Sequence, residues 1–259
     1  MTDNSALGDR MKAYEHVTRQ ALPRRTYSLL RVDGRAFHSL LRHSQKPFDY
    51  GFMETMDRVA GALCREIAGA VFAYSQSDEI SVLLTDFGSV HTEPWFGGVA
   101  QKMASIAASV ATATFNAQQP GTTATFDARV FTVPSAVEAA NYFIWRQRDA
   151  VRNSVSMAAQ AHFSHKSLHG LNGNEMQERL WREKGVNWND YPDGAKRGRV
   201  CQRVTFEEDV TWTHKRTGEV TTEPAIRSRW VSEPAPHFTA EPDGFLAGII
   251  PSLPVLQPA

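Results

Sequence analysis

Apolar residues in the first half of the chain follow two alternating periodicities. Short runs rich in β-branched and aromatic residues, such as residues 26–33 and 79–84, are typical of strands. Residues 51–69 instead carry apolar side chains at spacings of three and four, which predicts a helix. The full prediction is a helix over residues 5–20, strands over 26–33, 70–74, 79–84 and 123–133, and further helices over 51–69 and 96–115.

From residue 26 onward the predicted order is β-α-β-β-α-β. This is the order of the ferredoxin-like split unit, in which one antiparallel sheet carries two helices on one face. We therefore predict an α+β fold. The first and third strands are neighbours in such a sheet, so the end of the strand over 26–33 should meet the start of the strand over 79–84.

The second half of the chain has a different pattern. After Pro134 a long helical stretch is predicted, and later segments resemble a hairpin that turns at Thr217-Gly218. We predict that residues 1–133 form one domain with an N-terminal helix, and that residues 134–259 form an appended lobe of helices and a β-hairpin. The predicted elements are helices over 136–163 and 174–184, loops over 38–50 and 187–192, a strand over 200–206, a hairpin over 210–231 and an irregular tail from Ser232.

Composition narrows the class of protein. Lys plus Arg and Asp plus Glu both number 28, so any surface that attracts polyanions must be local. The two cysteines, Cys64 and Cys201, form no disulfide framework or zinc motif. The N-terminus lacks the apolar core of a signal peptide, and no run approaches the roughly 18 apolar residues of a membrane span. We predict a cytoplasmic protein with no membrane partner.

Two acidic residues stand at the ends of predicted strands. Asp33 closes the first strand, and Asp78 lies directly before the third. Carboxylates brought together on neighbouring strand ends suit a paired Mg²⁺ site for phosphoryl or nucleotidyl transfer. Glu79 follows Asp78, and its side chain should point in the opposite direction. It either supports the site from behind or faces solvent.

Three linked motifs surround these acids. They are Arg-Val-Asp-Gly-Arg-Ala-Phe-His at 31–38, Lys-Pro-Phe-Asp at 46–49 and Ala-Tyr-Ser-Gln-Ser-Asp-Glu-Ile-Ser at 73–81, and Phe-Asp-Ala-Arg-Val follows at 126–130. In this order and spacing they closely resemble the tRNA-His guanylyltransferase family. The resemblance implies an enzyme that adds nucleotides to the 5′ end of RNA in the 3′–5′ direction, with a catalytic domain similar to the palm of DNA polymerases.

The resemblance also assigns residues and ligands. It implies two Mg²⁺ ions held by Asp33, Asp78 and the carbonyl of Gly34. We add Glu79 to Asp33 and Asp78 as a candidate catalytic residue. The implied substrates are GTP, ATP and a tRNA or tRNA-like RNA, and the implied assembly is a homo-oligomer, a tetramer. The nucleotide would contact Asp33, Gly34, Arg35, Ala36, Phe37, His38, Lys46, Asp49, Ser77, Asp78 and Lys102.

The second half departs from the family pattern. Residues 147–154 read Gln-Arg-Asp-Ala-Val-Arg-Asn-Ser, where eukaryotic members carry His-Ile-Asn-Asn-Leu-Tyr-Asn-Thr. This resembles the guanylyltransferase-like branch, which is linked to template-dependent repair of 5′-truncated RNAs. In the appended lobe, the candidate RNA contacts are Arg148, Arg152, Asn153, Lys196 and Arg197, and the further basic residues Arg146, Arg199 and Arg203 are less specific candidates.

Two other functions fit parts of the pattern. A nucleotide cyclase or dinucleotide synthase can share a palm-like sheet but would not need the Arg-rich second half. A non-catalytic RNA-binding module with a degenerate palm would not need Asp33, Asp78 and Lys46. Nucleotidyl transfer to RNA accounts for both features.

Overall fold

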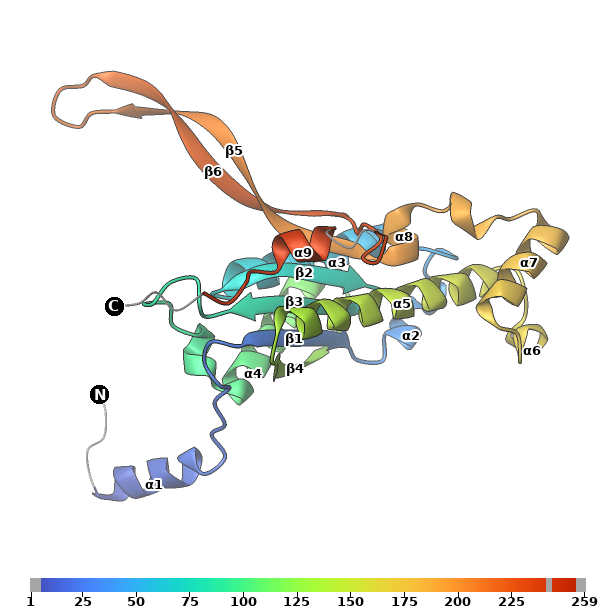
Figure 1. The fold of residues 1–259 in the computed structure, drawn as a ribbon, viewed down its shortest axis with the longest axis horizontal. Coiled ribbons are helices and arrows are strands. Elements are labelled where there is room, and N and C mark those ends of the chain that lie inside the picture. The colour runs from blue at the N-terminus through green and yellow to red at the C-terminus, as the bar shows by residue number, and fades with distance from the viewer. Residues whose placement is uncertain (1–5, 241–243, 255–259) are drawn as a thin grey trace.

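A single antiparallel sheet organises the molecule (Figure 1). The computed structural model describes residues 6–240 and 244–254. Its six strands lie in the order β4-β1-β3-β2-β5-β6. The strand bounds are β1 Tyr27–Gly34, β2 Ala70–Gln76, β3 Glu79–Thr85, β4 Phe126–Val133, β5 Arg199–Thr213 and β6 Val220–Pro234.

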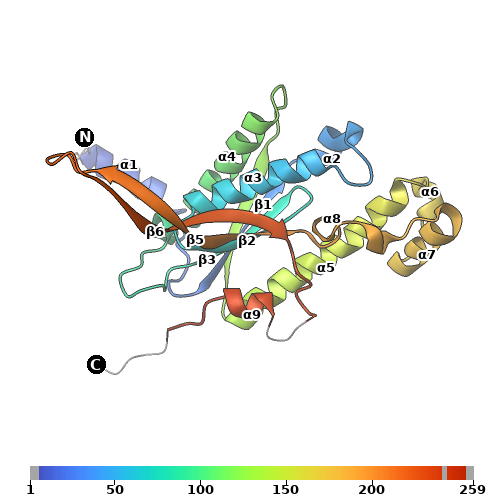
Figure 2. The same ribbon diagram turned by 90° about the horizontal axis from the view of Figure 1, so that it is seen from above.

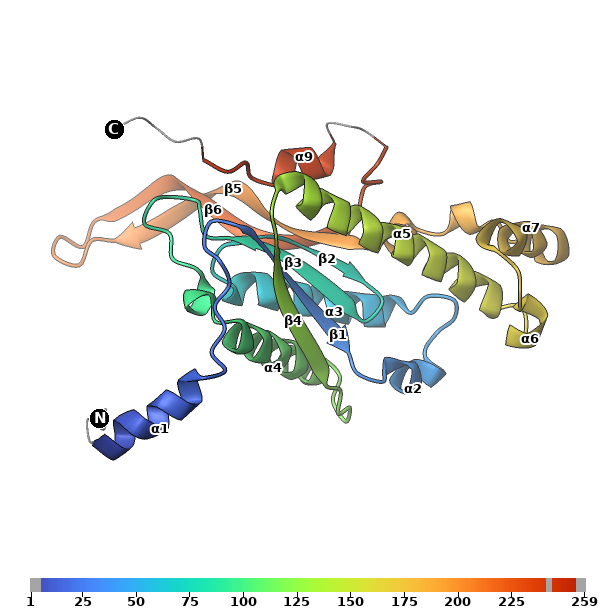
Figure 3. The ribbon, with the colours of Figure 1, turned by 60° about the horizontal axis from the view of Figure 1, so that its bottom comes forward.

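Helices cover both faces of this sheet (Figure 3). Helix α3 (Tyr50–Glu66) and helix α4 (Ala100–Gln118) lie on one face, where they pack on Leu30 and Val32. Helix α5 (Ala136–Gln160) lies on the other, where Phe143 packs on Phe72 with ring centroids 4.4 Å apart. Successive residues of each central strand therefore feed two hydrophobic cores, as the alternation of a strand requires.

The predicted ferredoxin-like unit is confirmed. Strands β4, β1, β3 and β2 have its order, and the helices predicted over residues 51–69 and 96–115 are α3 and α4 with shifted ends. Two short helices, α2 (Phe37–Leu40) and η1 (Leu41–His43), replace part of the loop predicted over 38–50. Helix α1 covers Ala6–His16 and buries no residue, and residue 5, where its prediction began, lies outside the described part.

The hairpin of the second half is longer than predicted. The ladder between β5 and β6 runs unbroken from Arg199↔Pro234 to Thr213↔Val220. The separate strand over 200–206 and hairpin over 210–231 are thus one element. The acidic residues at 207–209 lie within this ladder, where the ribbon is exposed and tolerates charge on both sides. Figures 1 and 2 show the hairpin projecting from the end of the molecule opposite the α6–α7 region.

The remaining elements are short. Helix α6 (His165–Leu168), helix α7 (Gly173–Lys184) and η3 (Trp188–Asp190) form a small core with the end of α5, and α8 (Asp193–Arg197) leads into β5. The loop predicted over 187–192 contains η3, and η2 (Trp95–Gly98) precedes α4. The tail predicted to be irregular includes the end of β6 and helix α9 (Phe245–Ile249), which packs beside α5.

Both halves of the chain contribute to the same sheet. Strand β5 pairs with β2, and the Tyr74 hydroxyl donates to the carbonyl of Arg197 at 2.6 Å. Gly198 has φ +80° and approaches Tyr74 so closely that a Cβ would overlap with its ring. The boundary between residues 133 and 134 stays a prediction. No helix in the described residues is long and apolar enough to cross a membrane.

Candidate active site

The register of β1 against β3 brings Asp33 and Asp78 together. Asp33 lies directly opposite Glu79, and the N–H of Gly34 donates to the carbonyl of Asp78 at 3.0 Å. Both acids are partly exposed at this end of the sheet. The two strand ends that carry the acids are therefore in contact, as the sequence predicts.

The charges of the two acids interact. Burial raises the pKa of Asp78, and the negative charge of Asp33 raises it further, while a backbone hydrogen bond and the Ser77 hydroxyl lower it. Neighbouring carboxylates of this kind suit a divalent cation, which offsets their repulsion. No cluster of three or more His, Cys, Asp and Glu side chains occurs in the described residues, so other ligands would be carbonyls, water or substrate. Two carboxylates with such ligands fit Mg²⁺.

The segment after Asp33 is held by the core beneath it. The Arg35 N–H donates to the carbonyl of Thr125 at 2.9 Å, and Ala36 has a left-handed backbone with φ 58°. Phe37 is buried, with its ring 5.2 Å from that of Phe115. Phe37 can thus contact a nucleotide only through its backbone, whereas the side chains of Arg35, Ala36 and His38 are exposed.

Gly34 is required by this packing. A Cβ at position 34 would overlap with the ring of Phe37. We expect Gly34→Ala to cost about 1–3 kcal/mol of unfolding free energy, the usual effect of overpacking, when measured by urea denaturation. Gly51→Ala is the matched control, because its Cβ would meet only Asp49 Oδ1 at 3.5 Å. Equal stability of the two variants would contradict the role given to Gly34.

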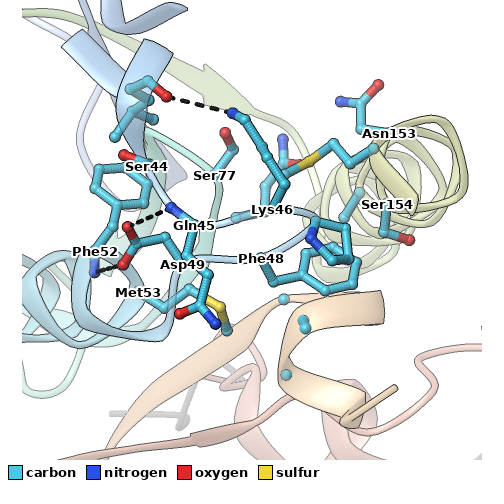
Figure 4. A pocket seen from close by; sticks show the side chains of 18 of the residues that line it. Ser44, Gln45, Lys46, Phe48, Asp49, Phe52, Met53, Ser77, Asn153 and Ser154 are labelled. Atoms are coloured by element: carbon cyan, nitrogen blue, oxygen red, sulfur yellow. Dashed lines mark hydrogen bonds between the residues drawn. The ribbon is translucent and has the colours of Figure 1, made fainter. Parts of the chain in front are cut away.

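A small hollow lies at the β2–β3 turn, where Ser77 precedes Asp78 (Figure 4). It holds about 80 Å³ and is lined by the segment before α3, the β2–β3 turn, α5 and α8. Lys46, Asp49, Ser77 and Asn153 all contribute to it. Lys46 Nζ donates to the carbonyl of Leu41 at 3.3 Å. The structure thus brings three of the predicted nucleotide contacts to one place, next to Asp78.

Asp49 organises this segment. Its carboxylate caps α3 by accepting from the N–H of Phe52 at 2.9 Å, and it also accepts from the N–H of Gln45 at 3.2 Å (Figure 4). An acidic N-cap of this kind stabilises a helix. Asp49 therefore shapes the wall of the hollow, and its predicted contact with a nucleotide stays a prediction.

The Glu79 side chain is buried, and its carboxylate is paired with an arginine. Arg146 of α5 binds its carboxylate with two hydrogen bonds of 2.7 Å, and Arg31 lies 3.9 Å away. Glu79 and Arg146 are both buried. The alternative of a solvent-facing Glu79 is wrong, and Arg146 is a buried ion-pair partner rather than an exposed RNA contact. The pair fixes α5 beside the acids.

The predicted RNA contacts differ in accessibility. Lys196 is buried, and its Nζ donates to the carbonyl of Asn189 at 2.7 Å and lies 3.1 Å from Asp193. Its prediction as an RNA contact is contradicted, because its charge is already used inside the fold. Arg199 is likewise buried, 2.6 Å from Asp57. The other predicted contacts are Arg148 and Asn153, which are exposed, Arg152, which pairs with Asp149, and Arg197, which pairs with Asp193.

Lys102 lies far from the acids. Its Nζ stands over the ring of Phe96, 4.6 Å from the centroid, near the beginning of α4. The other end of α4 carries Phe115, which packs on Phe37 beside Gly34. Thirteen residues of helix separate Lys102 from Phe115, or roughly 20 Å. The structure therefore does not bring Lys102 to this site.

Arg31 is a member of the site that the sequence reasoning missed. It lies two residues before Asp33 and therefore on the same face of β1. Its Nε is buried and has no hydrogen-bond partner within the described residues. The alternation of the strand was the available signal, since it places a cation beside Asp33.

Comparison with known proteins decides the family. The family model described as tRNAHis guanylyltransferase matches residues 8–134, which contain both acids. A bacterial tRNA(His) guanylyltransferase (Thg1)-like protein in complex with ATP is 39% identical, with a TM-score of 0.81, over 94% of this chain and 99% of that one. The chain belongs to the tRNAHis guanylyltransferase family. It is accordingly a nucleotidyltransferase with the family's palm-like fold.

Further members support this family membership. A bacterial Thg1-like protein in complex with GTP is 38% identical, with a TM-score of 0.74, and covers 91% of this chain and 94% of its own. The tRNA(His) guanylyltransferase of Debaryomyces hansenii is 27% identical over 69% of this chain and 74% of its own. The predicted resemblance is thus confirmed, and the similarity to tRNAHis guanylyltransferases extends into the second half of the chain.

Proposed function

We propose that this protein adds nucleotides to the 5′ end of tRNA or a tRNA-like RNA in the 3′–5′ direction. It would use ATP to activate a 5′-monophosphate, or accept a 5′-triphosphate, and then add GTP or a templated nucleotide. The proposal rests on one observation above all, which is the contact between the strand ends of Asp33 and Asp78 in a member of this family. The ATP and GTP complexes of its bacterial relatives support the choice of nucleotides.

Asp33, Asp78 and the carbonyl of Gly34 would hold two Mg²⁺ ions. When bound, the ions would lower the pKa of the incoming 3′-hydroxyl and offset the charge of the phosphates. That hydroxyl would lose its proton to water, and its oxygen would form a bond to the 5′ phosphorus of the RNA, while pyrophosphate or adenylate leaves with its electron pair. Lys46 and Ser77 lie where they can orient a triphosphate beside Asp78. Glu79, tied to Arg146, positions the third strand.

The appended lobe would contact the RNA through polar residues of α5 and α8. These are Arg148, Arg152 and Asn153, which are exposed, and Arg197, which is partly exposed, whereas Lys196 is buried. We also propose the tetramer and the cytoplasmic location that the family resemblance implies. Neither affects the chemistry at the acids.

Removal of the α5 charges tests the RNA contact. We expect Arg148→Gln with Arg152→Gln to weaken RNA binding and to reduce the slope of log K against log salt by about 2, since each arginine would neutralise one phosphate. Lys196→Gln should instead lower stability and leave the slope unchanged. Fluorescence anisotropy across a salt series measures both slopes. An unchanged slope in the double variant would remove these residues from the interface.

The function itself is tested with tRNA lacking its 5′ nucleotide. Each nucleoside triphosphate is supplied in turn, with substrates that carry or lack the His anticodon, and the 5′ end is sequenced. We expect addition of the nucleotide that restores pairing, whichever anticodon is present. Cyclic or dinucleotide products formed without RNA would favour a cyclase, and Mg²⁺-independent RNA binding without turnover would favour a non-catalytic module.

A further inference from the structure

A second hollow lies away from the acids, at the base of the projecting hairpin. It holds about 540 Å³ between the end of α3, the start of β2 and the hairpin strands. Its volume falls within the roughly 300–1,000 Å³ of small-molecule sites. Arg65, Arg203, Ser228 and Trp230 line it, and no acidic residue does. The site is therefore large enough for a nucleotide and has a cationic wall.

The register of the hairpin explains which side chains face this hollow. Arg203 lies directly opposite Trp230, on the same face of β5 as Cys201, which is buried in the core beneath α3. Arg229 also borders the hollow, although its side chain projects from the other face of the ribbon, where its guanidinium stands over the ring of Phe206, 5.2 Å from the centroid. Alternation along the strands thus places Arg203 and Trp230 on the face of the hollow, whereas Arg227, which lies opposite Phe206, is on the other face and does not line the hollow.

The polar groups in the hollow are incompletely used. Arg65 and Arg203 form no ion pair within the described residues, and Arg203 Nε donates to Ser228 Oγ at 2.8 Å. The remaining guanidinium N–H groups match the geometry of a phosphate. Trp230 is partly exposed and packs on the core beneath it. An indole held in this way offers a flat surface to an aromatic base.

We propose that this hollow binds a nucleotide unit, with the phosphate on Arg65 and Arg203 and the base stacked on Trp230. The ligand is either part of an RNA chain or a free nucleoside triphosphate, which share this chemistry. Strand β2 begins at the hollow with Ala70 and ends beside Asp78 with Gln76. Seven strand residues span roughly 20 Å, so this is a separate site that does not rest on the proposed function.

Arg65 also has a simpler explanation, because a cation near the end of a helix interacts favourably with the helix dipole. That explanation covers neither Arg203 nor Trp230, and it predicts no loss of ligand binding. The test is therefore a binding measurement, which needs no turnover at Asp33 and Asp78.

The experiment compares Arg65→Gln/Arg203→Gln with Arg216→Gln/Arg227→Gln, which removes two charges from exposed hairpin residues that do not line the hollow. RNA binding is followed by anisotropy across a salt series, and ATP and GTP stoichiometry by calorimetry. If the ligand is part of an RNA chain, the affinity of Arg65→Gln/Arg203→Gln for RNA should fall roughly tenfold. The slope of log K against log salt should fall by about 2. If the ligand is a free nucleotide, Arg65→Gln/Arg203→Gln should bind one fewer nucleotide per chain. Arg216→Gln/Arg227→Gln should change neither quantity.

Trp230→Phe supplies an independent readout. Stacking of a base on the indole should quench tryptophan fluorescence, and this component of the quenching should be absent from Trp230→Phe. Thermal unfolding confirms that each variant is folded. No change in RNA affinity, salt slope and nucleotide stoichiometry in Arg65→Gln/Arg203→Gln, or an equal loss in Arg216→Gln/Arg227→Gln, would overturn the proposal.

Discussion

Asp78→Asn is expected to reduce nucleotidyl transfer by about 10³-fold, and Asp33→Asn by a similar factor. Each change removes one of the two carboxylates that stand together at the ends of β1 and β3. Charge stabilisation by a bound cation contributes several kcal/mol to such reactions, and about 4 kcal/mol corresponds to three orders of magnitude in rate. Both side chains are partly exposed, so the variants should fold.

The measurement is single-turnover addition to 5′-truncated tRNA over a series of Mg²⁺ concentrations. If the carboxylates hold the metal, the residual activity of the variants should require more Mg²⁺ than that of the natural protein. Asp209→Asn is the control, because it removes an exposed strand carboxylate on the distant hairpin. Full activity in either strand-end variant would refute the assignment.

Arg146→Gln is expected to destabilise the fold by about 3–5 kcal/mol. The substitution leaves the Glu79 carboxylate buried without the partner that now makes two hydrogen bonds of 2.7 Å to it. An uncompensated charge in such surroundings has this cost. Urea denaturation at neutral pH measures the loss. Arg148→Gln, two positions along the same helix but exposed, should change stability by less than about 0.5 kcal/mol.

The loss in Arg146→Gln should depend on pH. Burial raises the pKa of Glu79 above its ordinary value of 4.5, and the charge of Arg146 lowers it in part. Without Arg146 the folded-state pKa rises further. A carboxyl group whose pKa is higher in the folded than in the unfolded state contributes its full stabilisation at pH values below the unfolded-state pKa. This stabilisation is lost as the pH rises through the folded-state pKa. The deficit should therefore be smaller at about pH 5 than at pH 7, and a constant deficit would contradict the mechanism.

Local sequence patterns were sufficient to predict the catalytic sheet. The runs over 26–33 and 79–84 are mostly apolar because each strand supplies two hydrophobic cores. The helices predicted over 51–69 and 96–115 carry apolar residues on one face. The position of Asp33 and Asp78 at strand ends followed directly from these elements. Once the ferredoxin-like order was recognised, their proximity was a consequence of topology.

What the sequence could not reveal depends on distant partners. Lys196 belongs to a basic run, and only the folded chain shows that Asn189 and Asp193 already bind its ammonium group. Glu79 and Arg146 are 67 residues apart, so their pairing leaves no local pattern. Lys102 is a cation of the kind that contacts phosphate, but it lies near the beginning of α4, at the end of the helix that is distant from the acids.

The pairing of β5 with β2 limits which parts of this enzyme can be exchanged. Tyr74 bonds to Arg197, and Phe143 covers Phe72, so the second half of the chain is fused to the sheet that carries Asp33 and Asp78 through shared apolar surface. Grafting a foreign recognition lobe after residue 133 would leave that surface open to water and prone to aggregation. Divergence of substrate choice in such a protein is therefore expected to proceed by substitutions on its exposed faces, with wholesale exchange of lobes disfavoured.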